Sequence, residues 1–292
     1  MASIAGCTGD TLRARALTAL LLADPAAKVA AVADLADTPA VAAGDSVSAL
    51  VLAMPEGPAP FGSMREDQIL AAIPGRPARP QLVHPQHVKQ RAMGTPEGRA
   101  ALIHSLAHIE FNAINLALDI IWRYAGMPED FYRDWARVAS EEALHYSMLS
   151  AHLKTLGWAY GDMPAHDGLW EMAERTAGDL LARLALVPRT LEARGLDASP
   201  LVRDKLAAAG DSAAAAIIDI ILHDEIGHVA IGNHWYRYLC QARSLDPIAE
   251  FPKLAAQYRA PRMRGPFNLS ARRAAGFTEA ELQALQERAA GP

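Results

Sequence analysis

Apolar residues recur three and four positions apart along four long stretches of the chain, which is the period of a helix with one buried face. Capping residues, prolines and glycines mark where these stretches end. Pro188 lies inside the third stretch and should kink it. The predicted helices cover about residues 96–124, 129–156, 169–194 and 212–242. The pattern therefore predicts an all-α fold built on a four-helix bundle.

The flanking segments are expected to pack on this bundle. Residues 10–37 predict two short helices, and the proline- and glycine-rich segment 38–98 predicts extended chain with a short helix near 66–73. Thr278 and Glu281 have the spacing of a capping box and predict a last short helix. We therefore divide the chain into an N-terminal extension (1–95), a bundle (96–242) and a C-terminal arm (243–292).

Composition and charge narrow the class of protein. The chain has 292 residues, of which 51% are hydrophobic, and its formal net charge of −5 argues against a nucleic-acid-binding protein. Cys7 and Cys240 are too few for a disulfide framework and suit a reducing cytosol. No signal peptide is evident, and the longest apolar run, 213–222, is too short to span a membrane. We expect a cytoplasmic protein.

Two of the predicted helices place a carboxylate and an imidazole on their apolar stripe. In the second helix, Glu142 and His145 share the face of Trp135 and Leu149. In the fourth helix, Glu225 and His228 share the face of Ile221 and Trp235. One Glu-x-x-His motif occurs often by chance, but two on buried faces require a physical cause.

The other two helices each add one inward glutamate. Glu110 precedes Glu142 by 32 positions, and Glu192 precedes Glu225 by 33. Two helical hairpins of nearly equal span therefore carry the same polar pattern. Buried carboxylates repel one another unless they are protonated or bridged by cations. Two divalent ions would resolve the conflict, and carboxylate with imidazole suits iron or manganese.

The chain resembles the ferritin-like di-iron carboxylate superfamily. It is close to a bacterial ferritin-like family known as a domain of unknown function, and distantly similar to a di-iron tRNA hydroxylase. The resemblance covers nearly the whole chain, and it rests on the stretches GRPARPQLVHP, TPEGRAALIHSLAHIEFNAINLALD, SEEALHY, LEARGLD, HDEIGHV and RGPFNLSARRAAGF.

The resemblance implies a ferritin-like bundle with two iron ions (manganese is the alternative) and dioxygen as cosubstrate. It implies as metal ligands Glu110, Glu142, His145, Glu192, Glu225 and His228. It leaves open which glutamates bridge the ions. The expected activity is oxygen-dependent oxidation, with hydroxylation of a small or tethered organic substrate the favoured reaction. A separate electron-donor reductase is expected, since no flavin or iron–sulfur motif is present.

Some site positions remain open. Glu141 competes with Glu142 because it lies one turn from His145, and Glu171 and Glu174 compete with Glu192. Residues predicted to support the ligands by hydrogen bonds are His108, Asp219 and Asp224. Five arginines of the tail could hold a phosphate-bearing substrate, although surface ion pairs explain them more simply: Arg259, Arg262, Arg264, Arg272 and Arg273.

Two other classes of function are compatible with the sequence. A ferroxidase, peroxide-removing or iron-handling protein would use the same ligands, but the long segments on both sides of the bundle favour an enzyme pocket. A metal-free helical interaction module is the third hypothesis. No membrane partner is expected, and the sequence leaves a homodimer open.

Overall fold

The computed structural model describes residues 11–33, 35, 38, 66–88 and 91–290. Over these residues the chain is all-α, as the hydrophobic period predicts. Their β-type pairing is limited to one isolated bridge between Leu82 and Ala165. None of the described helices is long and apolar enough to cross a membrane. Much of the predicted N-terminal wrapping, residues 39–65, lies outside the described part of the chain.

Local signals set the ends of the longest helices. These helices are α5 (Pro96–Arg123), α6 (Glu129–Thr155) and α10 (Ser212–Ala242), close to their predicted ranges. At the start of α10, the Asp211 carboxylate accepts a hydrogen bond from the Ala214 N–H at 3.0 Å. Gly126, with φ +79°, lies in the turn between α5 and α6.

The chain forms two compact units, each assembled from separated segments. The first unit comprises the described residues of 1–81, 107–147 and 160–164. The second comprises those of 82–106, 148–159 and 165–292. Helices α5 and α6 therefore contribute residues to both units.

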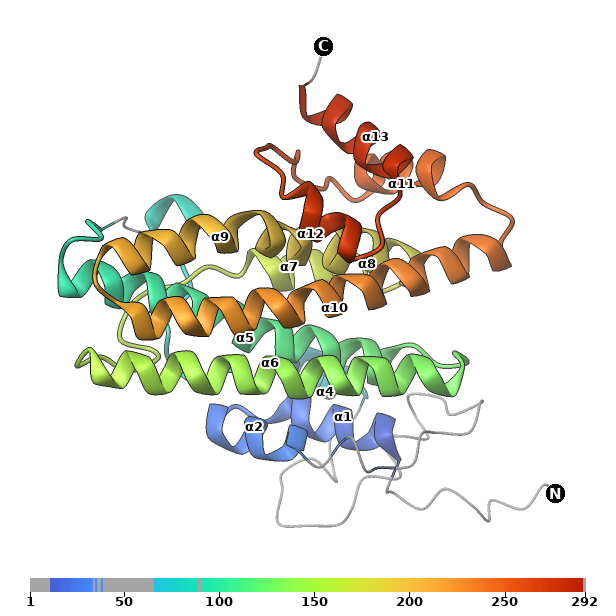
Figure 1. Cartoon of the computed structure of the whole chain (residues 1–292). Helices are drawn as coiled ribbons and strands as arrows, with labels where there is room; N and C mark the ends of the chain where they lie inside the picture. The colour runs from blue at the N-terminus through green and yellow to red at the C-terminus, as the bar shows by residue number, and fades with distance from the viewer. Residues whose placement is uncertain (1–10, 34, 36–37, 39–65, 89–90, 291–292) are drawn as a thin grey trace. The chain divides into compact units, whose positions relative to one another are not determined.

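In the first unit, two buried cations bind the N-terminal helices to α5. These helices are α1 (Leu12–Leu21) and α2 (Pro25–Ala33), which pack on each other (Figure 1); α4 (Glu66–Ala72) belongs to the same unit. From α1, Arg13 Nη2 donates to the Trp122 carbonyl at 2.6 Å. From α2, Lys28 Nζ donates to the Leu20 carbonyl at 3.1 Å and to the Asn115 side chain on α5. Each charge is buried together with hydrogen-bond partners, as burial requires.

The second unit holds the remaining helices, with α9 and α10 side by side (Figure 1). Helix α13 packs against α11 and α12. Helix α11 also packs against α8 and α10, and α12 also packs against α9 and α10. The bounds are η1 (Pro85–His87), α7 (Gly168–Arg175), α8 (Leu180–Leu186), a π-helix η2 (Val187–Glu192), α9 (Ala193–Ala208), α11 (Pro247–Gln257), α12 (Leu269–Ala274) and α13 (Glu279–Ala290).

The predicted third helix differs most from the structure. It is interrupted between α7 and α8, where Asp179 caps the new helix by accepting the Leu181 N–H at 3.0 Å. Pro188 produces a π-helix rather than a simple kink, since proline cannot supply the α-helical N–H. Gly195 does not end the helix but lies inside α9, which continues to Ala208. The predicted end at about residue 194 was therefore wrong.

The C-terminal helix confirms its predicted cap. The Thr278 N–H donates to Glu281 Oε2 at 2.8 Å, and the Glu281 N–H donates to Thr278 Oγ1 at 3.2 Å. This reciprocal pair is the capping box expected from the sequence, and it starts α13.

Candidate metal centre

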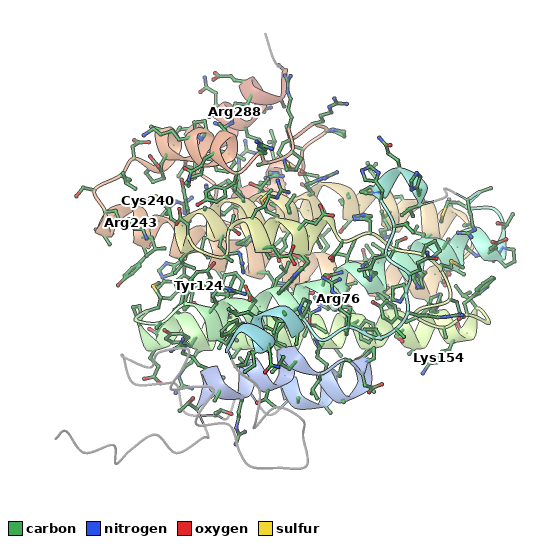
Figure 2. All side chains as sticks on the ribbon, turned by 180° about the vertical axis from the view of Figure 1, so that it is seen from behind. Arg76, Tyr124, Lys154, Cys240, Arg243 and Arg288 are labelled. Carbon is green, nitrogen blue, oxygen red and sulfur yellow. The ribbon has the colours of Figure 1, made fainter. Side chains whose placement is uncertain are left out.

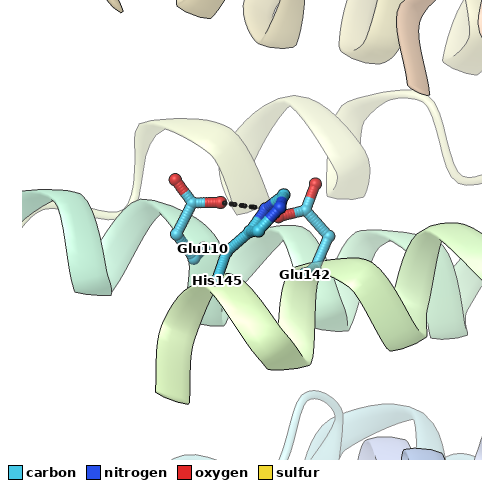
Figure 3. Close-up of side chains that lie close together, drawn as sticks. All are labelled: Glu110, Glu142 and His145. Atoms are coloured by element: carbon cyan, nitrogen blue, oxygen red, sulfur yellow. Dashed lines mark ion pairs between the residues drawn. The ribbon is translucent and has the colours of Figure 1, made fainter. Parts of the chain in front are cut away.

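The first set of predicted ligands comes together inside the first unit. Glu110 projects from α5, whereas Glu142 and His145 project from α6 one turn apart (Figure 3). All three are buried, with 3%, 1% and 0% of their surface exposed. One ligand atom of each lies within 4.8 Å of the others, close enough for a single ion. Helical register alone places the α6 pair on one face.

The charges of this set depend strongly on one another. His145 Nδ1 lies 3.5 Å from Glu110 Oε2 and 3.4 Å from Glu142 Oε2. Burial raises the pKa of the Glu110 carboxyl to about 8, and the Glu142 carboxylate acts in the same direction. Burial would lower the pKa of His145, but the two carboxylates raise it to about 11. At neutral pH, Glu110 and His145 therefore hold protons that a metal ion would have to displace on binding.

The second set lies in the second unit. Glu225 and His228 project from the buried face of α10, with 7% and 0% of their surface exposed. Glu225 Oε2 lies 3.9 Å from His228 Nδ1. Glu192 is half-buried at the end of the π-helix. The side chain of Glu225 reaches α9, where a Cβ on Gly195 would lie 4.0 Å from the Glu225 carboxyl carbon.

The π-helix approaches α10 closely at one point. A Cβ on Gly232 would lie 2.6 Å from the Cβ of Pro188, so only glycine fits there without displacement. The wider helical turn is also supported by Thr190, whose hydroxyl donates to the Ala185 carbonyl at 2.8 Å. Short π-helical segments are frequent at functional sites, and this one carries a predicted ligand, Glu192.

The donor set fits a hard or borderline metal ion. Each set offers carboxylate oxygens and one imidazole. Neither set contains a cysteine, and the buried Cys240 belongs to neither of them. Such donors suit iron or manganese better than a structural zinc site. The burial of the first set also supplies a reason for a cation, because adjacent buried carboxylates are costly without one.

The open alternatives among the glutamates fare differently in the structure. Glu141 is half-buried whereas Glu142 is buried within the first set, which favours Glu142. Glu171 and Glu174 are exposed on α7, and Glu174 accepts a hydrogen bond from the Trp170 indole at 2.9 Å. The choice of Glu192 over these two glutamates stays a prediction.

The predicted supporting residues take three different positions. His108 is buried, and its ring nitrogens lie 2.9 Å from the Tyr160 hydroxyl and 3.0 Å from Asn112 Nδ2. Asp219 instead faces solvent and pairs with Arg203 at 3.3 Å, so the structure places it in a surface ion pair. Asp224 is half-buried beside Glu225 on α10 and stays a prediction.

Sequence reasoning missed an aromatic cluster next to the first set. Phe111 and Tyr146, the neighbours in sequence of Glu110 and His145, have ring centroids 5.4 Å apart. Tyr160 stands 5.2 Å from Tyr146 and 5.6 Å from Phe111. Tyr160 comes from a loop, and no local pattern indicated that its ring would return to α5 and α6.

Comparison with known proteins finds a family model and a relative that match most of the chain. Residues 21–283 match the family model described as "Protein of unknown function (DUF455)". A relative from Haemophilus influenzae, described as "Uncharacterized protein", is 52% identical over 218 residues, covering 72% of this chain and 76% of its own length. No solved structure matches the chain.

Proposed function

This chain belongs to the DUF455 family of proteins of unknown function, and we propose that it is a dinuclear metal oxidoreductase. The proposal assigns two iron ions to the two Glu–Glu–His sets, with manganese as the alternative. The observation that carries it is the buried set of Glu110, Glu142 and His145, whose ligand atoms lie within 4.8 Å. The equal donors and matching spacing of the second set support a second ion.

Bound ions would supply the activation of dioxygen and the oxidising power for attack on a carbon–hydrogen bond of an organic substrate. The protein's own part is to hold ligands rigidly and to exclude water. Buried positions on long helices suit this task, since α5 and α6 fix the carboxylates and the imidazole by backbone register. His145 and Glu110 would release their protons as ligands bind metal. Electrons would come from a separate reductase.

Metal analysis of purified protein tests the centre. Protein produced with iron should contain about two ions per chain. Glu142→Gln and His228→Gln should each lose most of the metal, because each removes a ligand. The matched controls are Glu141→Gln and His223→Gln, which alter the half-buried and exposed neighbours on the same helices. Full metal content in both ligand variants would overturn the site.

Reaction with dioxygen tests the activity. Reduced, iron-loaded protein should consume dioxygen and develop a transient absorption band, and the ligand variants should not. A stable metal-loaded protein that ignores dioxygen would contradict the oxidoreductase assignment. Oxidation of added iron without any organic substrate would instead favour the metal-handling alternative.

A further inference from the structure

A pocket in the second unit is lined by three arginines. It lies between the π-helix, α11, α12 and α13, and it has a volume of about 30 Å³. That volume exceeds what one ordered water needs and suits a small polar group. Its charged lining residues are Arg189, Arg272, Arg288 and Glu281, and Phe251 and Phe277 supply aromatic walls.

Arg189 uses only one edge of its guanidinium for the fold. It is 5% exposed, with Nε donating to Asn233 Oδ1 and Nη2 donating to Glu281 Oε1, each at 2.5 Å. Its carbon Cζ lies 4.3 Å from the Tyr236 ring centroid. Nη1 has no acceptor among the residues that the structure describes. A buried arginine on a pocket wall thus keeps donors available.

Arg272 repeats this arrangement from α12. It is 1% exposed, and Nε and Nη2 donate to the Asp197 carboxylate at 3.0 and 2.6 Å. Nη2 also donates to the Ala193 carbonyl at 3.1 Å. No described residue accepts a hydrogen bond from its Nη1. Two buried arginines that line one pocket therefore each keep a nitrogen without a described acceptor.

Arg288 completes the set at the rim. It projects from α13 (Figure 2), is exposed, and places Cζ 5.0 Å from the Phe251 ring centroid. Within the described chain its guanidinium has no hydrogen-bond acceptor. Stacking on the ring holds the planar group in place, while its N–H donors stay available for a ligand.

The charge around the pocket is unbalanced. Asp197 neutralises Arg272, and Glu281 is shared by Arg189 and by Arg237, whose Nη2 lies 2.6 Å away. With Arg288 and the Glu287 carboxylate that acts on it included, the group has four arginines and three carboxylates. Such an excess of guanidinium in a partly buried pocket suits an oxyanion, which arginine binds through paired N–H donors.

We propose that this pocket binds the oxyanion group, carboxylate or phosphate, of a small ligand whose apolar part contacts Phe251 and Phe277. The proposal is independent of the metal centre, since none of the six predicted ligands lines the pocket. Of the five tail arginines singled out in the sequence, only Arg272 lines it.

Binding measurements on metal-free, full-length protein test the proposal. The probes are inorganic phosphate and benzoate, titrated calorimetrically at constant ionic strength set with chloride. Saturable binding of either probe is expected, and competition between the two shows whether they share the site. Arg288→Gln should weaken binding at least tenfold without loss of folding, because Arg288 is exposed and its contact with α11 is the stacking on Phe251.

Arg273→Gln is the matched control. It removes the same charge from α12, but Arg273 is paired with Glu279 and does not line the pocket. Arg189→Lys keeps the buried charge and removes the guanidinium fork, and should also weaken binding. Equal weakening by Arg288→Gln and Arg273→Gln, or no saturable binding of either probe, would overturn the proposal. So would a crystal grown with both probes whose pocket contains water alone.

Discussion

Gly232 on α10 meets Pro188 of the π-helix so closely that a Cβ at position 232 would lie 2.6 Å from the proline Cβ. On α10, Gly232 lies one turn after His228. On the π-helix, Pro188 lies one turn before Glu192. The contact therefore sets the spacing between two elements that carry predicted ligands.

Gly232→Ala should lower the free energy of unfolding by about 1–3 kcal/mol, because the added methyl group overpacks this contact. It should also reduce the bound metal, since the π-helix must move away. Gly227→Ala on the same helix is the control, because a Cβ there meets nothing within 4 Å. That change should raise stability by about 0.5–1 kcal/mol through helix propensity. Denaturant unfolding and metal analysis measure both effects; equal stability of the two variants would contradict the account.

Metal affinity should rise with pH. The raised pKa values of Glu110, about 8, and His145, about 11, mean that metal binding must displace about two protons near neutral pH. The logarithm of the affinity should climb steeply up to about pH 8 and less steeply above it. Calorimetry in buffers of different ionisation enthalpy measures the released protons. Glu110→Gln should release fewer, and a pH-independent affinity would contradict the prediction.

The same groups make the metal-free protein less stable as pH rises. The folded-state pKa values of Glu110 and His145 both lie above their unfolded values. The stability that each group contributes is therefore fully present below its unfolded pKa and is lost as pH rises through its folded pKa. For Glu110 the loss spans about pH 4 to 8. Thermal unfolding of chelator-treated protein should show it, and Glu110→Gln should reduce the slope in that window.

Glu281 should support stability at neutral pH and lose this role in acid. Burial would raise its pKa, but Arg189, the Thr278 N–H and Arg237 together lower it below its usual range. Its contribution is therefore present above the unfolded pKa, near 4.3, and is lost as pH falls through the folded pKa. Glu281→Gln should cost about 3–5 kcal/mol at pH 7, because it leaves buried Arg189 without its partner.

The difference between Glu281→Gln and the wild type should narrow in acid, as wild-type Glu281 becomes protonated. Glu279→Gln is the control, since Glu279 pairs with Arg273 at the surface and should matter little. Urea unfolding at a series of pH values measures the gap. A gap that stays constant from pH 7 to pH 3 would show that charge is not its cause.

Lys28→Met should destabilise the first unit. Lys28 is fully buried, and Nζ donates to the carbonyls of Leu20 and Gly75 at 3.1 Å and to Asn115. Burial, with a smaller effect of Arg76, lowers the pKa of Lys28 to about 7. Removal of the amine takes this donor from the Gly75 carbonyl and the Asn115 side chain, whereas the Leu20 carbonyl still accepts the Gly75 N–H at 2.8 Å.

The expected loss for Lys28→Met is about 2–3 kcal/mol in the free energy of unfolding, because unsatisfied buried acceptors are costly. Lys154→Met is the matched control on the exposed side of α6 (Figure 2) and should be nearly neutral. If both variants unfold at the same denaturant concentration, the Gly75 carbonyl and the Asn115 side chain do not depend on Lys28.

Much of the fold could be predicted because its signals are local. Asp211 caps α10, Thr278 and Glu281 cap α13, and the helical period placed Glu142 with His145 and Glu225 with His228 on buried faces. A cap needs residues within one turn, and a buried face needs only a repeat of three and four positions. These properties of the sequence also identified the candidate ligands.

Tertiary structure decided what depends on distant residues. The π-helix around Pro188 requires a glycine 44 positions later, at Gly232. Asp219 was predicted beside the ligands but pairs with Arg203 of a neighbouring helix. The arginine pocket joins Arg189 to residues of the C-terminal arm. The sequence by itself determined the helices α5, α6 and α10 and the polar groups that α6 and α10 bury. Only packing determined the breaks in the third predicted helix and which buried groups meet, because side-chain contacts across the fold have no local period.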